Sequence, residues 1–147
     1  MKNKKGFTLI ELLVVIAIIG LLSTLSVLAL NSARARSRDA KRITDIKQIQ
    51  TALEMYYNDA GVYPPDTLIA SGSVEFGSNV YMMKIPTAPT PVDGASCVTD
   101  GTNTYVYDYN DSSGFGGSYT LTYCLGAATG GVLAGSNTAT PAGITSQ

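Results

Sequence analysis

Very few residues in this 147-residue chain have the type and setting that chemistry needs. Histidine, the commonest general base and metal ligand, does not occur in the sequence. Two cysteines, Cys97 and Cys124, could form one disulfide or stay as free thiols. One acid, Glu11, stands inside an apolar run that extends from Phe7 to about Leu30. Because the sequence shows no nucleophile and base pair, zinc-ligand spacing or phosphate loop, we expect neither an enzyme nor a cofactor.

The carboxylate of Glu11 is costly to keep in an apolar setting. A charged side chain at the centre of a membrane helix costs roughly 2.5 to 3.5 kcal/mol on insertion scales, so it needs a cationic partner or a shallow position near water. Pairing with a cation in a buried place would strengthen the attraction. Glu11 therefore points to a cationic partner, and a side chain that reaches water alone is the alternative.

The element that positions Glu11 is a candidate membrane helix. The run from Phe7 to Leu30 holds 24 residues, and would be about 36 Å long as a helix, which exceeds a hydrocarbon core of about 30 Å. Lys2, Lys4 and Lys5 precede it and favour a cytoplasmic N-terminus. Five bases follow the run and favour the opposite orientation: Arg34, Arg36, Arg38, Lys41 and Arg42. We expect the long distal part to be translocated as a domain in spite of them.

A cleaved secretory signal peptide is the rival explanation of this N-terminus. The apolar region of such a peptide is usually about 7 to 15 residues long and ends at a small-residue cleavage site. Here the apolar run is longer, contains an acid near its start and is followed by the basic stretch NSARARSR. These features favour a retained anchor.

The hexapeptide Gly6–Glu11, GFTLIE, and the segment ELLVVIAIIGLL resemble the processing site of type IV pilins and related pseudopilins. In that family a short basic leader ends in glycine, the mature chain begins with phenylalanine, and the fifth mature residue is glutamate. The resemblance implies a leader at residues 1–6, cleavage between Gly6 and Phe7 by a prepilin peptidase, and N-methylation of Phe7 by the same enzyme. It also implies that Glu11 pairs with the amino terminus of an adjacent subunit.

The same resemblance implies the partners and the location of the chain. The partners are other copies in a helical homopolymer, an assembly ATPase and a platform membrane protein. The chain would sit in the cytoplasmic membrane before assembly and in an extracellular filament afterwards. We expect a pilus subunit first, and the major pseudopilin of a type II secretion or competence (DNA uptake) system second. A monomeric membrane-anchored binding module is the third reading.

The helix is predicted to continue beyond the membrane. In AKRITDIKQIQTALEMYY the apolar positions recur every three or four residues: Ala40, Ile43, Ile46, Ile49, Leu53 and Tyr56. Gly61 and Pro64-Pro65 supply a stop. We therefore predict one helix over about 7–59, apolar all round in 7–30 and amphipathic in 31–60.

The bases between Arg34 and Arg42 could serve a nucleic acid or an anionic lipid. We favour a solvated helix surface that pairs with acids of neighbouring subunits, such as Asp45, Glu54 or Asp59. From residue 61 onward Lys84 is the only base among six acids, which argues against a nucleic-acid surface there.

Residues 61–147 are predicted to form a small globular head, which makes the fold class α+β with a pilin-like arrangement. TYVYDYN and SYTLTYCL alternate Tyr and Leu with other residues, and DSSGFGG between them indicates a hairpin. One face of this antiparallel sheet should cover the helix stripe. The tail is expected to add one short strand around Val132 to Ala134.

Two further predictions concern the loops. Behind a membrane-directing N-terminus the two cysteines favour a Cys97–Cys124 disulfide, and closing such a loop is worth about 3.5 kcal/mol in the chain-entropy model. The run Pro86-Thr87-Ala88-Pro89 resembles a Pro-x-Asp-Pro element that precedes a calcium site in type II secretion pseudopilins, but it has alanine in place of the acid. We expect no metal, and we expect the four loop acids to be solvated turn residues: Asp93, Asp100, Asp108 and Asp111.

Overall fold

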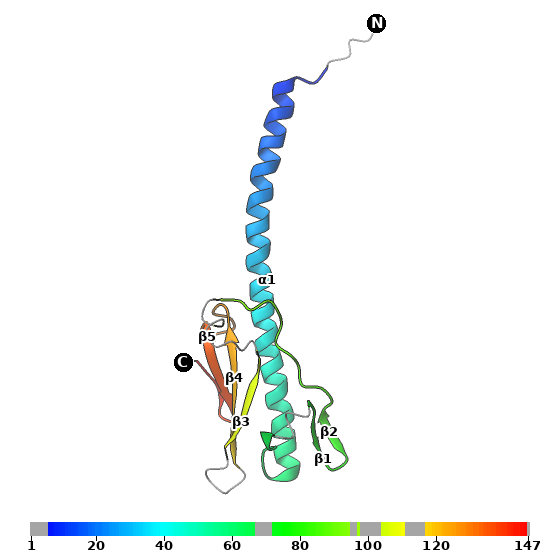
Figure 1. The fold of residues 1–147 in the computed structure, drawn as a ribbon, viewed down its shortest axis with the longest axis vertical. Helices are drawn as coiled ribbons and strands as arrows, with labels where there is room; N and C mark the ends of the chain where they lie inside the picture. Colours follow the sequence, from blue (N-terminus) through cyan, green and yellow to red (C-terminus); the bar gives the residue numbers. More distant parts are fainter. Residues whose placement is uncertain (1–5, 67–71, 95–96, 98–103, 111–116, 147) are drawn as a thin grey trace. The chain divides into compact units, whose positions relative to one another are not determined.

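The computed structural model describes residues 6–66, 72–94, 97, 104–110 and 117–146 (Figure 1). Its one long helix is α1, Leu9–Ala60. The strands are β1 Val74–Phe76, β2 Asn79–Met82, β3 Val106–Asn110, β4 Ser118–Leu125, β5 Gly135–Thr140 and β6 Gly143–Ser146. The chain divides into two compact units, Met1–Arg34 and Ala35–Gln147. The predicted α+β class, with one long N-terminal helix and antiparallel sheets, is confirmed.

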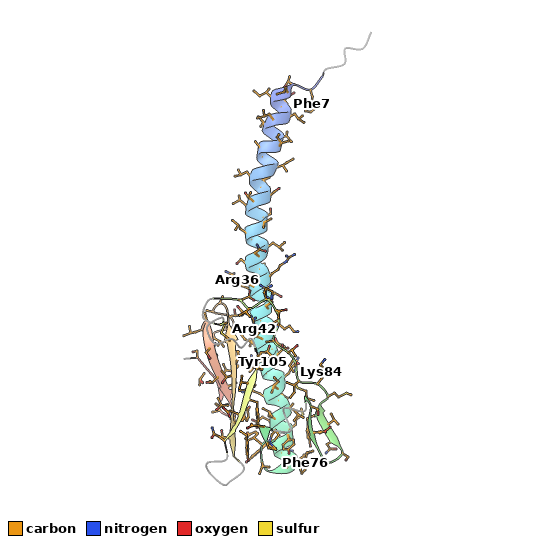
Figure 2. The ribbon with its side chains drawn as sticks, in the orientation of Figure 1. Phe7, Arg36, Arg42, Phe76, Lys84 and Tyr105 are labelled. Atoms are coloured by element: carbon orange, nitrogen blue, oxygen red, sulfur yellow. A yellow bond between two sulfur atoms is a disulfide. The ribbon has the colours of Figure 1, made fainter. Side chains whose placement is uncertain are left out.

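In the first unit α1 is helical without a covering layer. Its large apolar side chains are all exposed, from Leu9 at 80% to Leu30 at 50%. Figure 2 shows these side chains standing out around the helix. By length and composition α1 is the one helix in the described part of the chain that could cross a membrane. Leucine, isoleucine, valine and alanine favour this helix only where lipid or another helix replaces water around it.

In the second unit α1 buries one stripe against the head. The predicted apolar positions are buried from Ile43 to Tyr56, and Ala52 joins them. The prediction for Ala40 was wrong, because Ala40 is exposed and Asp39, one position earlier, is fully buried. An acid can take this core position because its oxygens accept hydrogen bonds from the head, which are described below.

The head sheet has the antiparallel strand order β3-β4-β5-β6. Strand β4 alternates as predicted, with four buried side chains facing α1: Tyr119, Leu121, Tyr123 and Leu125. In β3, Tyr107 and Tyr109 pack against the same core, while Val106 and Asp108 point outward. The predicted hairpin of these two strands is confirmed by their register, which pairs Tyr109 with Tyr119. Its DSSGFGG connection lies outside the described residues except for Gly117.

The prediction for the tail was wrong in position and number of strands. Val132 is buried, but it makes only an isolated bridge to Thr129, and the strands come later as the hairpin β5–β6. The inward positions of β5 are Gly135, Asn137 and Ala139, which are too small or too polar to give a hydrophobic alternation. Such residues leave no hydrophobic periodicity from which a strand could be predicted.

A second hairpin, β1–β2, packs on the C-terminal end of α1 and was not anticipated. Val74 of β1 is fully buried beside Ala52 and Tyr56 of the helix. The ring of Phe76 meets Tyr56 edge to face, with ring centroids 5.4 Å apart.

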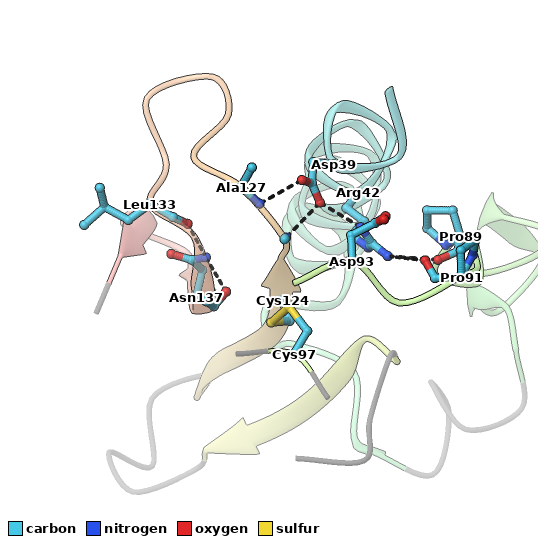
Figure 3. The surroundings of a disulfide bond; sticks show 12 residues. Asp39, Arg42, Pro89, Pro91, Asp93, Cys97, Cys124, Ala127, Leu133 and Asn137 are labelled. Carbon is cyan, nitrogen blue, oxygen red and sulfur yellow. Dashed lines mark hydrogen bonds and ion pairs between the residues drawn. A yellow bond between two sulfur atoms is a disulfide. The ribbon is translucent and has the colours of Figure 1, made fainter. Parts of the chain in front are cut away.

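The predicted disulfide joins Cys97 to Cys124, with 5.6 Å between the two Cα atoms (Figure 3). Cys124 lies on the face of β4 that points away from α1, and Cys97 is buried. The bond therefore fastens the segment that precedes β3 to the outer side of the sheet.

Candidate functional site

The N-terminal candidate site begins with three residues that precede the helix. Gly6, Phe7 and Thr8 are non-helical and exposed, and the exposed fraction of Phe7 is 86%. A Cβ atom built on Gly6 would have no neighbour within 4 Å. The fold of this chain therefore does not require glycine at position 6, and the Gly6–Phe7 peptide bond lies in exposed, non-helical chain. The leader residues 1–5 lie outside the described residues.

Glu11 and Thr8 together form the N-terminal cap of α1. The Thr8 N–H donates to Oε2 of Glu11 at 2.8 Å, the Thr8 hydroxyl donates to the same oxygen at 2.9 Å, and the Glu11 N–H donates to the hydroxyl at 3.3 Å. This reciprocal pattern is a capping box, in which the side chains satisfy backbone donors that the helix leaves open. Our reading of the sequence missed it, although the T-x-x-E spacing is its known signal.

The cap leaves the charge of Glu11 without a base. In the described part of the chain no lysine or arginine forms an ion pair with its carboxylate. Glu11 also lines an apolar groove of about 370 Å³ with Phe7, Ile10, Val14 and Val15. A carboxylate held in one orientation beside an uncovered apolar surface is suited to meet a cation from another molecule.

The second charged cluster ties α1 to the head. Arg38 binds Asp93 in a bidentate pair, with Nε and Nη2 each 2.5 Å from a carboxylate oxygen. Arg42, which is only 1% exposed, donates to Asp39 at 2.7 Å and to the Pro89 carbonyl at 2.9 Å. The oxygens of Asp39 also accept the backbone N–H groups of Gly126 and Ala127, both at 3.0 Å (Figure 3).

This network depends on a close approach of two backbones. A Cβ atom on Gly126 would lie 2.5 Å from Cβ of Asp93, so only glycine lets the loop and the end of β4 come together here. The network thus joins α1, the loop that carries Asp93 and the end of β4. Its residues are far apart in the sequence, and no local pattern pointed to their pairing.

The expectation of a solvated basic surface was wrong for Arg38 and Arg42. Both are engaged within the chain, and Asp93 is not a solvated turn acid, because its carboxylate binds Arg38. The three acids expected to serve neighbouring subunits also have donors in the same chain. Tyr105 donates to Asp45 at 2.9 Å, Tyr63 donates to Glu54 at 3.0 Å, and Tyr81 donates to Asp59.

The pKa values of several of these groups are shifted by their contacts. The hydrogen bond from Arg38 lowers the pKa of Asp93, and Asp93 in turn raises the pKa of Arg38. Burial, and then the hydrogen bond to Asp45, raises the pKa of Tyr105. Burial raises the pKa of Tyr119 to about 12. The Arg38–Asp93 pair is therefore charged, and the phenols of Tyr105 and Tyr119 are protonated, at neutral pH.

The other bases of the run remain exposed. In the part of the chain that the structure describes, Arg34, Arg36 and Lys41 form no ion pair. Among the same residues no group of three His, Cys, Asp or Glu side chains could hold a metal ion. Of the loop acids named above, Asp108 is exposed on β3, and Asp100 and Asp111 lie outside the described residues.

Comparison with known proteins matches both the N-terminal segment and a longer stretch. A family model described as the prokaryotic N-terminal methylation motif matches residues 1–27. The type II secretion system core protein G of Vibrio cholerae is 39% identical over 44% of this chain. The type IV major pilin protein PilE of Neisseria gonorrhoeae is 35% identical over 56% of this chain. No solved structure matches the chain.

Coverage of the relatives differs. The chain spans 44% of the length of the Vibrio protein and 51% of the Neisseria pilin. It spans 71% of the type II secretion system core protein G of Klebsiella pneumoniae, to which it is 30% identical over 60% of its own length. With the methylation motif at its start and the capped apolar helix that follows, the chain belongs to the family of type IV pilins and type II secretion pseudopilins.

Proposed function

We propose that this chain is the structural subunit of a type IV pilus-like surface filament. The observation that carries the proposal is the first part of α1, where a capped acid stands on an apolar helix that nothing in the described chain covers. Such a helix needs lipid or other helices around it. A subunit that moves from a bilayer into a bundle of identical helices meets that need in both states.

The proposed life cycle uses the residues at the start of the chain. Residues 1–6 are a leader, a prepilin peptidase cuts after Gly6, and Phe7 becomes an N-methylated terminus. The new amino group stays cationic, so it can pair with Glu11 of an adjacent subunit, as the family resemblance implies. The exposed Gly6–Phe7 bond and the unpaired charge of Glu11 support this sequence of events.

We further propose the domain roles that go with it. Residues 7–30 span the cytoplasmic membrane before assembly, with the N-terminus inside and the head outside, and later form the filament core. Residues 31–60 continue the helix into the head of residues 61–147. An assembly ATPase and a platform membrane protein supply the directional work, and the chain itself has a structural and not a catalytic role.

A pseudopilin of a type II secretion system is the second candidate. It is favoured by the relatives from Vibrio and Klebsiella, which bear the name of that system's core protein G. Both candidates polymerise through the same helix, and they differ in the length and place of the filament. Electron microscopy of sheared surface material separates them: long filaments of this chain support the pilus. Their absence, with the chain kept at the cell envelope, supports the pseudopilin or a monomeric anchored module.

The processing step is tested by intact mass. Filament subunits should lack residues 1–6 and carry one added methyl group. Gly6→Ala should leave the fold unchanged, because the site is open, yet it should accumulate uncut chain. Gly20→Ala is the matched control, since it also adds a methyl group in open space and should be processed normally. A mature subunit that still begins at Met1 would refute the proposal.

The assembly step is tested at Glu11. Glu11→Ala should keep membrane insertion and abolish filaments, because the charge that selects the axial register is gone. Glu75→Ala removes an equally exposed acid on β1 and should assemble normally. Normal filaments from the Glu11→Ala chain would rule out the register role.

A further inference from the structure

The part of α1 in the second unit has one face that the head leaves uncovered. The sheet and the β1–β2 hairpin bury the opposite stripe of the helix. We call the uncovered side the outer face, and its exposed residues are Ala40, Lys41, Thr44, Lys47, Gln48, Thr51, Glu54, Met55, Asn58 and Asp59. These positions follow each other at helical spacing, so they form one continuous surface.

The middle of the outer face can be covered at little cost. The Thr44 hydroxyl donates to the Ala40 carbonyl at 2.9 Å, and the Thr51 hydroxyl donates to the Lys47 carbonyl at 2.8 Å. Neither hydroxyl would lose its only hydrogen bond if another molecule excluded water. Met55, which is 52% exposed, adds an apolar surface that gains from contact.

The charges of the outer face are separated along the helix. Lys47 stands toward its N-terminal end, and Glu54 and Asp59 stand toward its C-terminal end. Lys47 has no acid three or four residues away, and Glu54 has no base at those spacings, so neither can pair within the helix. In the described residues none of the three takes part in an ion pair.

A groove lies between the two acids. It measures about 390 Å³ and is lined by Thr51, Glu54, Met55, Asn58, Asp59 and Tyr81. Each carboxylate already accepts one phenol, from Tyr63 or Tyr81, and a carboxylate has about four acceptor positions. The groove therefore offers an apolar floor between two oriented anions, which suits the long stem and terminal ammonium of a lysine.

We propose that this groove receives Lys47 of a second copy of the chain. The inference rests on the proposed function, because subunits that leave one membrane are all parallel. Two parallel copies place Lys47 of one beside Glu54 of the next after a shift of about 10 Å, and beside Asp59 after about 18 Å. Lys41 lies on the same face and would meet Glu54 after a shift of about 20 Å. The outer face is thus an interface between heads, in which a parallel stagger of about 10 Å brings the Lys47 ammonium of one copy to the Glu54 carboxylate of the next.

A charge exchange tests the contact in intact filaments. Lys47→Glu should lower the yield of sheared filaments at least about tenfold, and the pair Glu54→Lys with Asp59→Lys should do the same. Co-expression of the two variant chains should restore filaments that contain both. Lys84→Glu, on the segment that follows β2 and off the outer face (Figure 2), is the matched control and should assemble normally. Membrane levels and an intact Cys97–Cys124 bond establish that each variant is folded.

A cross-link in the unaltered chain gives a second readout. Carbodiimide treatment of wild-type filaments should join the Lys47 amine to Glu54 or Asp59 as an amide, with loss of water, in peptides from two different subunits. If wild-type filaments form but Lys47→Glu assembles normally, the groove contact is wrong and the proposed function stands. If the wild-type chain forms no filament, the proposed function itself fails.

Discussion

The two parts of α1 differ in what surrounds their apolar side chains and their acids. Between Ala35 and Ala60 one stripe of apolar side chains is buried by the head, and each of the four acids accepts a hydrogen bond from another segment. Between Leu9 and Arg34 the apolar side chains are exposed, and the single acid is bound only by the threonine three residues before it. The acids of the later part find their donors within the chain, whereas the apolar side chains of the earlier part stay exposed.

This difference separates the part of α1 that stabilises the head from the part that carries the candidate processing and assembly residues. A change in the later part should alter the free energy of unfolding of the head and leave insertion and processing alone. A change in the earlier part should hardly affect the head, because that part makes no contribution to its core. Four variants, studied as full-length chains in detergent, test this division from the largest expected effect to the smallest.

The largest effect is expected from Arg42→Met. The change removes the cation that pairs with the buried Asp39 carboxylate and the hydrogen bond from Arg42 to the Pro89 carbonyl, so the head should lose about 3 to 5 kcal/mol of stability. Urea unfolding followed by tyrosine fluorescence measures the loss. Lys41→Met, an exposed neighbour, should cost much less. Equal midpoints for the two variants would contradict the structural role of the network.

Removal of the disulfide comes next. Cys97→Ser combined with Cys124→Ser opens a loop with a sequence separation of 27, which should cost about 3.5 kcal/mol in the chain-entropy model. Reduced wild-type chain should unfold at nearly the same urea concentration as the double variant. An oxidised wild type that is no more stable than the reduced form would refute this prediction.

Asp93→Asn should change how stability depends on pH. Because Arg38 lowers the pKa of Asp93, the pair stabilises the head above the unfolded carboxyl pKa of about 3.9, and this stabilisation is lost as the pH falls through the lower folded pKa. The midpoint temperature of thermal unfolding should therefore fall more steeply with decreasing pH for the wild type than for Asp93→Asn. Asp108→Asn, at an exposed position of β3, should keep the wild-type slope. If the midpoint temperatures of the wild type and of Asp93→Asn fall with pH at the same rate, the Arg38–Asp93 pairing is contradicted.

The smallest effect belongs to the earlier part. Thr8→Ala removes the cap of α1 and should weaken the first helical turn by about 1 kcal/mol, with no change in the unfolding of the head. Hydrogen exchange of the amides from Ile10 to Leu12 measures it in micelles. Thr24→Ala is the control, since its hydroxyl only bonds back to the Leu21 carbonyl inside the helix. Faster exchange throughout α1 would show that the effect is not confined to the cap.

Periodicity in the sequence predicted the elements whose large side chains repeat. The stripe from Ile43 to Tyr56 and the alternation of β4 could be read directly, because each apolar residue there faces the core. The hairpin β5–β6 could not, because its inward residues are glycine, asparagine and alanine. Hydrophobic patterns report large buried side chains and are silent where close packing needs small ones.

Charged contacts were harder to predict than elements. Arg38 and Asp93 are 55 positions apart, and only the folded chain brings them together. The burial of Asp39 was not predicted, because a buried carboxylate leaves no trace in the sequence unless its donors are known. By contrast Gly6, Phe7 and Glu11 were identified as candidates from their order alone, because the chemistry proposed for them is set by adjacent positions and not by the fold.

The tyrosines that hold the acids of α1 have a consequence for the setting in which the head can operate. Burial and the hydrogen bonds to these acids raise the pKa of Tyr63, Tyr81 and Tyr105, so the three phenols keep their protons over the whole interval from about pH 5 to 9. The chain has no histidine, whose charge would change inside that interval. A head fastened through Tyr63, Tyr81 and Tyr105 therefore keeps the same hydrogen bonds in mildly acidic and mildly alkaline surroundings. The attachment of the head to α1 through these three hydrogen bonds is therefore tolerant of pH and does not sense it.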